Sequence, residues 1–142
     1  MAPKAIPRAV RRGVRERALD RCEYCLHPAA YSTAPYVCEH FVPRSAGGGD
    51  TADELAWSCP GCNSHKYAKT LGTDPLTGRR VRIFNPRRQL WQAHFQWSSD
   101  RLLIVGHTAT GRATVEALRL NRLELVNLRQ ALLIAGEHPV NY

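Results

Sequence analysis

Two short cysteine motifs decide the fold: Cys22-Glu23-Tyr24-Cys25 and Cys59-Pro60-Gly61-Cys62. Each motif spaces its cysteines so that two sulfur atoms of one turn can reach one metal ion, and structural zinc sites favour four such ligands in a tetrahedron. The N-terminal residues carry no apolar stretch, so no secretory signal is expected and paired cysteines indicate metal ligands before disulfides. The sequence therefore predicts one structural zinc ion on four thiolates. Two unrelated cysteine pairs are the alternative. The predicted zinc ligands are Cys22, Cys25, Cys59 and Cys62.

The segment between the motifs, residues 26–58, is closed into a loop by the predicted zinc ion, which offsets much of its ordering entropy. It contains His40, whose imidazole titrates near neutral pH and can act as a general base. A histidine that merely lies beside a loop is the alternative. Glu39 precedes it and points to the opposite side of a regular strand, so both can serve one site only if the backbone bends there.

The features of residues 21–71 follow a specific order. In chain order they are Glu39-His40, Pro43-Arg44-Ser45, three consecutive glycines and Cys59-x-x-Cys62-Asn63. This combination resembles the HNH endonuclease family, in its zinc-bound ββα-metal branch. The resemblance implies divalent-metal-dependent hydrolysis of phosphodiester bonds, with Glu39 and Asn63 as ligands of a catalytic Mg²⁺ or another divalent cation. The amide oxygen of Asn63 suits such a hard cation.

Two positions of the resembled motif leave alternatives open. Where the family usually has an asparagine that orients the histidine, five residues before Cys59, this chain has Glu54. A carboxylate there can accept a hydrogen bond from the imidazole of His40 and fix its tautomer, which makes Glu54 a predicted catalytic residue. A solvated turn residue is the alternative. His65 competes with Asn63 for the last motif position, but the two lie about 200° apart around a helix and cannot face one ion.

The chain is basic, with 20 Lys and Arg against 12 Asp and Glu and a net charge of +8. Such a surplus favours a polyanionic partner, and we expect nucleic acid, with DNA favoured over RNA. Arg44, Lys66 and Lys69 bracket the predicted site and are assigned to phosphates, with ordinary exposed charge as the alternative. A catalytically weak or inactive zinc-stabilised nucleic-acid-binding module is the rival function. The apolar runs are too short to cross a membrane, and a cytoplasmic location is expected.

The fold class expected is α+β. An N-terminal tail and basic helix occupy residues 1–20, the ββα-metal core residues 21–72, and a strand-plus-helix extension packed on the core residues 73–142. Residues 1–7 are expected to be loose, and Gly72 is expected to end the core helix. Trp91, Phe95 and Trp97 are expected in the core of the extension, although they could stack on unpaired bases. Helices are expected at residues 8–20, 63–71, 110–118 and 122–135, and strands at 36–41, 56–58, 79–84, 95–97 and 102–107.

Overall fold

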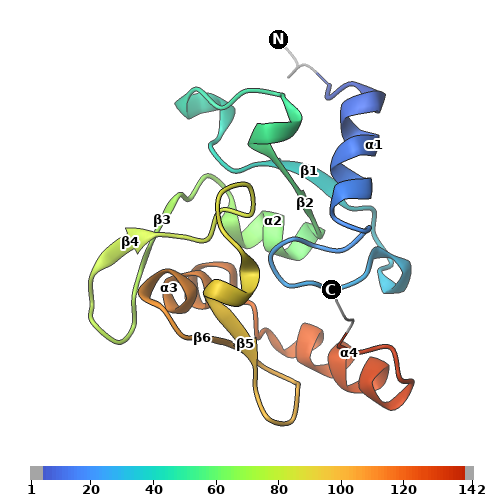
Figure 1. The fold of residues 1–142 in the computed structure, drawn as a ribbon, viewed down its shortest axis with the longest axis vertical. Helices are drawn as coiled ribbons and strands as arrows, with labels where there is room; N and C mark the ends of the chain where they lie inside the picture. Colours follow the sequence, from blue (N-terminus) through green and yellow to red (C-terminus); the bar gives the residue numbers. More distant parts are fainter. Residues whose placement is uncertain (1–4, 140–142) are drawn as a thin grey trace. The chain divides into compact units, whose positions relative to one another are not determined.

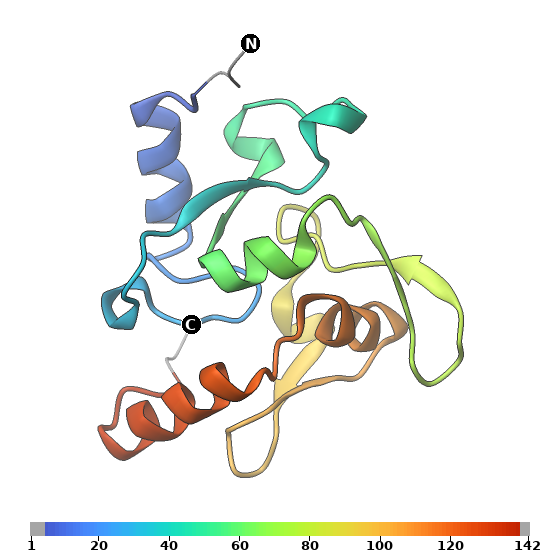
Figure 2. The ribbon, with the colours of Figure 1, turned by 180° about the vertical axis from the view of Figure 1, so that it is seen from behind.

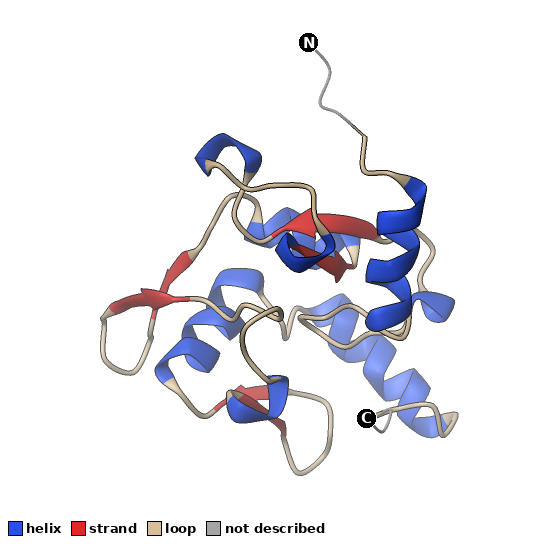
Figure 3. Ribbon diagram, turned by 45° about the horizontal axis from the view of Figure 1, so that its top comes forward, coloured by secondary structure: helices blue, strands red, loops and turns tan. Residues whose placement is uncertain are grey.

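The computed structural model describes residues 5–139, so residues 1–4 of the predicted loose tail lie outside it. The chain divides into two compact units. The first unit runs to Thr70 and also includes Asn85–Gln89, and the second comprises Leu71–Phe84 and the residues from Leu90 onward. The fold is of the α+β class, and within residues 5–139 the strands pair as three separate two-stranded hairpins (Figure 3). Among residues 5–139, no helix is both long and apolar enough to span a bilayer.

The first unit is built around one hairpin. Figures 1 and 2, which view it from opposite sides, show helix α1 alongside this hairpin. In the antiparallel pair, Cys38 lies opposite Trp57 and His40 opposite Leu55. All four residues of the second strand are buried, so it forms the centre of this unit. The elements are α1 (Arg8–Arg17), β1 (Val37–His40), β2 (Leu55–Ser58), α2 (Pro60–Lys66) and three 3-10 turns, Ala29–Tyr31, Arg44–Ala46 and Ala52–Glu54.

Helix α1 buries only Val14 and is otherwise a surface helix. Arg17 attaches its last turn, because its guanidinium donates hydrogen bonds to the carbonyl oxygens of Ala52 at 2.9 Å and Leu55 at 2.8 Å. Backbone carbonyls are strong acceptors that must be satisfied when they are shielded from water. Since Val14 is the helix's only buried residue, these hydrogen bonds of Arg17 help to attach the helix to the hairpin.

Helix α2 corrects the prediction of a helix over residues 63–71. It begins at Pro60, where the missing N–H costs nothing in the first turn, and Cys59 caps it by accepting the N–H of Cys62 on its sulfur. Tyr67 ends it with a φ of 52°. Gly72 therefore does not stop a helix. It lies in a strand, where a Cβ would meet Ile83 and Ala113 within 3.2 Å.

The second unit contains two hairpins and two helices. Its elements are β3 (Leu71–Thr73), β4 (Arg80–Arg82), β5 (Phe95–Trp97), β6 (Ile104–Gly106), α3 (Ala109–Leu118), α4 (Leu123–Ile134) and the 3-10 turn Trp91–Ala93. The ring of Phe95 packs 5.3 Å from that of Phe84 and 5.1 Å from that of Trp91, and Trp91 lies 5.8 Å from Trp97. Trp91 and Phe95 are therefore core residues, as predicted, whereas Trp97 is only partly buried.

Candidate nuclease site and zinc clamp

The four predicted zinc ligands converge. The sulfur atoms of Cys22, Cys25, Cys59 and Cys62 all lie within 4.8 Å of one another, and all four residues are buried. A tetrahedral ion with zinc–sulfur bonds of about 2.3 Å holds its sulfur atoms about 3.8 Å apart. The sulfur atoms of Cys25 and Cys59 are 3.8 Å apart. The donor set and its geometry therefore fit a structural zinc ion.

Local structure brings each cysteine pair to this point. The first pair lies in a turn that closes when the N–H of Leu26 donates to the carbonyl of Cys22 at 2.8 Å, and Leu26 adopts a left-handed φ of 66°. The second pair lies in the first turn of α2. The ion would thus join the turn after α1 to the start of α2 and hold the β1–β2 hairpin between them.

His40 lies at the end of β1, with 17% of its side chain exposed. Its Nε2 atom lies 2.7 Å from Oδ1 of Asp50, and the guanidinium of Arg44 donates to the same oxygen at 3.0 Å. No partner of Nδ1 is found among residues 5–139. The hydrogen bond from His40, assisted by the one from Arg44, lowers the pKa of Asp50 although partial desolvation opposes the shift. Asp50 is therefore a carboxylate at neutral pH and fixes the imidazole with Nδ1 open to water.

Glu54 does not fill the place predicted for it. Its carboxylate accepts hydrogen bonds from Oγ1 of Thr51 at 2.8 Å and from the N–H of Gly49 at 3.2 Å. These hydrogen bonds lower its pKa. The expectation that Glu54 orients the histidine is thus wrong, because the carboxylate at hydrogen-bond distance from His40 is that of Asp50. Glu54 instead braces the loop on both sides of Asp50.

Asp50 is the site residue that sequence reasoning missed. It follows the three glycines, ten residues after His40, and the hairpin register opposes His40 to Leu55. A carboxylate in the returning half of the connection between two paired strands can come back to the strand end where the connection began. The signal for Asp50 in the sequence is therefore its place after the three glycines, four residues before the family position that Glu54 occupies.

Glu39 and His40 point to opposite sides of β1, and no bend brings them together. The side chain of Glu39 is buried, with Oε2 accepting from the hydroxyl of Tyr24 at 2.5 Å and Oε1 paired with Nζ of Lys66 at 2.5 Å. Burial raises the pKa of Glu39, and the ammonium of Lys66 opposes that shift. Tyr24, which donates this hydrogen bond, is not among the residues predicted for the site. As it stands, Glu39 does not offer an open oxygen to a catalytic ion, and that role stays a prediction.

Lys66 corrects a second prediction. It is fully buried rather than exposed to phosphates, and Nζ also donates to the carbonyl of Phe41 at 2.8 Å and to that of His40 at 3.3 Å. Burial lowers the pKa of Lys66, while Glu39 opposes the shift. The lysine thus fixes the backbone from which the imidazole of His40 projects, and it is not a phosphate ligand.

The remaining predicted residues lie on or beyond α2. Asn63 and His65 are both partly buried, and Lys69 is exposed, with Nζ donating to the carbonyl of His65 at 3.1 Å. Within residues 5–139, the four cysteines are the only group of three or more His, Cys, Asp or Glu residues placed to hold one ion. The choice between Asn63 and His65 as a ligand of the catalytic ion therefore stays a prediction.

One of the comparisons with known proteins found a match. The family model for HNH endonucleases matches residues 22–69, which contain both cysteine motifs and His40. No curated protein and no solved structure matches the chain. A domain of this family implies nuclease activity on nucleic acid. Residues 22–69, with their buried four-cysteine cluster, form an HNH endonuclease domain.

Proposed function

We propose that the protein is a divalent-metal-dependent endonuclease that hydrolyses phosphodiester bonds in nucleic acid, with DNA as the favoured substrate. In this proposal β1, β2 and α2 are a ββα-metal core, and His40 is the general base. One observation carries the proposal: the imidazole of His40 is held at 2.7 Å by the carboxylate of Asp50 and is partly exposed. Such a pair is the arrangement that activates a nucleophile in hydrolases.

The chemistry follows from the two ring nitrogens. When Nε2 carries the proton and donates to Asp50, the lone pair on Nδ1 can take a proton from water as that water attacks phosphorus. Asp50 then stabilises the imidazolium that forms, without itself being protonated. The guanidinium of Arg44 adds positive charge beside this pair, where negative charge develops on the phosphate. Asp50 and Arg44 thus hold and polarise the base that His40 provides.

Dependence on Mg²⁺ or another divalent cation rests on the family resemblance. A divalent cation on the phosphate would neutralise charge on the attacked group. The carboxylate of Glu39 is engaged by Lys66 and Tyr24, so it fits this role only if the ion pair opens. Assays with EDTA, Mg²⁺ and Mn²⁺ therefore test the cation separately from the base.

Nicking of supercoiled plasmid by the zinc-loaded protein tests the proposal. His40→Ala should lower the nicking rate by about 10²- to 10⁴-fold, the usual contribution of a general base. His107→Ala is the matched control, because His107 is an exposed histidine of the second unit and should leave the rate unchanged. Equal nicking by the wild type and His40→Ala would remove His40 from the mechanism.

A zinc-stabilised nucleic-acid-binding module without catalysis is the second candidate. The closed ion pair between Glu39 and Lys66 favours it, because this pair occupies an oxygen expected to bind the catalytic ion. This candidate predicts salt-dependent DNA binding and no nicking with any divalent cation. The two functions are therefore distinguished by whether the protein that binds DNA also cleaves it.

A further inference from the structure

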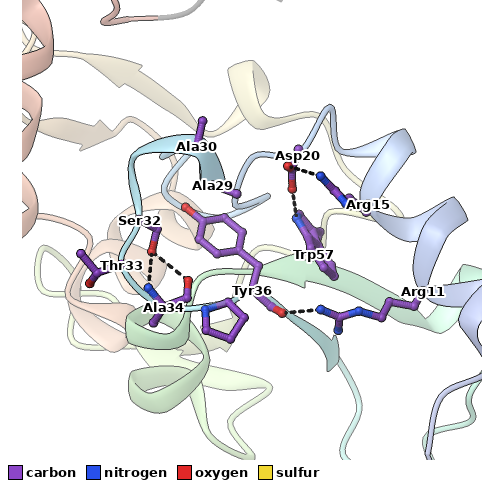
Figure 4. A pocket seen from close by; sticks show the side chains of 11 residues that line it. Arg11, Arg15, Asp20, Ala29, Ala30, Ser32, Thr33, Ala34, Tyr36 and Trp57 are labelled. Atoms are coloured by element: carbon purple, nitrogen blue, oxygen red, sulfur yellow. Dashed lines mark hydrogen bonds and ion pairs between the residues drawn. The ribbon is translucent and has the colours of Figure 1, made fainter.

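The first unit contains a cavity of about 460 Å³ that the catalytic residues do not line. It lies between the exposed side of α1 and the segment of residues 29–36 (Figure 4). Tyr36 immediately precedes β1, and His40 ends that strand, so the cavity begins about 13 Å along the strand from the catalytic base. A bound polynucleotide at His40 can therefore reach the cavity within about four stacked base steps.

Two arginines of α1 form one wall. Arg11 and Arg15 are four residues apart and share a helix face. Arg11 lies 4.8 Å above the ring of Trp57 and donates to the carbonyl of Tyr36 at 3.0 Å, so its guanidinium is held over the cavity (Figure 4). These contacts reduce the side-chain entropy that binding would otherwise cost, and a guanidinium keeps further N–H donors for a phosphate.

The cavity also holds one acidic residue, and its charge is already balanced. Asp20 accepts hydrogen bonds from Arg15 at 3.0 Å and from the indole N–H of Trp57 at 2.9 Å. The other ring that lines the cavity, Tyr36, donates its hydroxyl to the carbonyl of His27 at 2.7 Å. The polar atoms of both aromatic residues are thus satisfied by the protein, and the two arginines against one acid leave a net positive wall.

The opposite wall is small and largely apolar. Ala29, Ala30, Ala34 and Pro35 line it, together with the hydroxyl groups of Ser32 and Thr33. The volume lies within the range of about 300–1,000 Å³ that small-ligand sites occupy. A flat apolar body with an anionic group at one end matches this cavity, with the body against the alanines and the anion on the guanidiniums. A nucleotide has this construction.

We propose that this cavity receives one unpaired nucleotide of the nucleic-acid substrate, with its phosphate on Arg11 and Arg15. This inference rests on the proposed function, since it identifies the substrate contact of the same domain. It assigns to the protein a preference for substrates with a single-stranded or frayed segment near the cleavage position. The stacked arginine and the apolar wall read no base sequence, so the preference concerns strandedness.

Titration of the zinc-loaded full chain with dAMP, followed through the NMR signal of the Trp57 indole N–H, measures the site directly. The wild type should show a saturable shift at millimolar dAMP. Arg11→Gln/Arg15→Gln should weaken dAMP binding by about tenfold or more through loss of charge-assisted hydrogen bonds. Arg8→Gln/Arg12→Gln removes the same charge from the same helix outside the cavity and should change the affinity much less.

A second variant guards against an effect of Arg11 on folding. Ala30→Phe should fill the cavity without removing charge, because Ala30 is exposed at its wall. It should abolish the dAMP shift and weaken binding of a single-stranded oligonucleotide more than binding of a duplex. Equal affinity for dAMP in Ala30→Phe and the wild type would overturn the proposal.

A titration with inorganic phosphate gives the affinity of the cavity for an anion without a base. Affinity for phosphate equal to that for dAMP would show an anion site without a place for the base, which contradicts the proposal. An unshifted Trp57 signal in the wild type would do the same. These measurements use no cleavage, so they can be made in His40→Ala. A protein that binds dAMP but never nicks DNA would fail the proposed nuclease function while keeping the cavity assignment.

Discussion

At the residue scale, the main observation is that Asp50 holds His40 at 2.7 Å while Glu54 holds the loop around Asp50. A carboxylate that fixes a catalytic imidazole is worth several orders of magnitude in rate in hydrolases of other folds. The carboxylate that braces the loop acts only through the position of Asp50. The two acids should therefore differ in how strongly their removal affects catalysis.

Asp50→Asn should lower the nicking rate by about 10²-fold or more, because an amide can stabilise the wrong tautomer of His40 and cannot balance the imidazolium. Glu54→Gln should cost much less, because the amide oxygen still accepts from the N–H of Gly49 and the amide NH2 can donate to the hydroxyl of Thr51. Single-turnover nicking rates of both variants check this order. A larger loss in Glu54→Gln than in Asp50→Asn would contradict the assignment.

Lys66 gives a stability prediction at the same scale. Lys66→Met should lower the free energy of unfolding by about 3–5 kcal/mol, because it leaves the buried carboxylate of Glu39 without its partner. Lys69→Met, an exposed lysine just beyond the same helix, is the matched control and should be nearly neutral. Urea unfolding of the two variants measures the difference. Equal stability of Lys66→Met and the wild type would contradict the ion pair.

The pH dependence of that loss has a defined sign. Burial already raises the pKa of Glu39, and removal of Lys66 takes away the charge that opposes this shift. A carboxyl group with a higher pKa in the folded state stabilises the fold below its unfolded pKa, and this contribution disappears as pH rises through the folded pKa. Lys66→Met should therefore lose less stability at mildly acid pH than at neutral pH.

At the scale of elements, zinc is the predicted link between the turn after α1 and the start of α2. Mass spectrometry under non-denaturing conditions should find one zinc ion per chain. Cys59→Ala should lose it and unfold the hairpin, because metal binding and folding are coupled in small sites of this kind. Cys38→Ala, which changes the fifth cysteine on β1, should keep both zinc and fold. Full zinc content in Cys59→Ala would exclude the four-thiolate site.

The sequence predicted the elements better than their ends. The spacing of the cysteines predicted the cluster that the four thiols form, because four thiolates in two turns have few uses other than zinc binding. The end of α2 was predicted five residues too late, since Tyr67, with a φ of 52°, rather than a glycine, ends it. Non-glycine residues rarely adopt positive φ, so nothing local to Tyr67 indicates this.

The site was predicted in part, for a related reason. The motif predicts that His40 belongs to the site. The hydrogen-bond and ion-pair partners of the site residues depend on side-chain orientation, which the motif does not give. Strand alternation alone places Glu39 away from His40, and the structure keeps that alternation. The buried pair with Lys66 could not be predicted, because a lysine next to a nuclease motif is more often exposed than buried.

At the scale of the whole molecule, the net charge of +8 and an HNH endonuclease domain in residues 22–69 point to a polyanionic substrate. The first compact unit runs to Thr70, and Asn85–Gln89 returns to it from the later part of the chain. Within that stretch, Arg87 forms an ion pair with Glu23, next to the first zinc-binding turn. Such a return of the chain depends on tertiary contacts that no local pattern encodes.

Chemical rescue of a variant that lacks the imidazole of His40 tests most directly the claim that His40 is the general base. The zinc-loaded protein should cleave a labelled DNA in the presence of Mg²⁺ or Mn²⁺, and His40→Gly should be inactive. Added imidazole should restore a measurable part of the rate, because it can occupy the vacated position beside Asp50 and accept the proton of water. Cleavage by His40→Gly at the wild-type rate without imidazole, or no cleavage by the zinc-loaded wild type with either cation, would contradict the account.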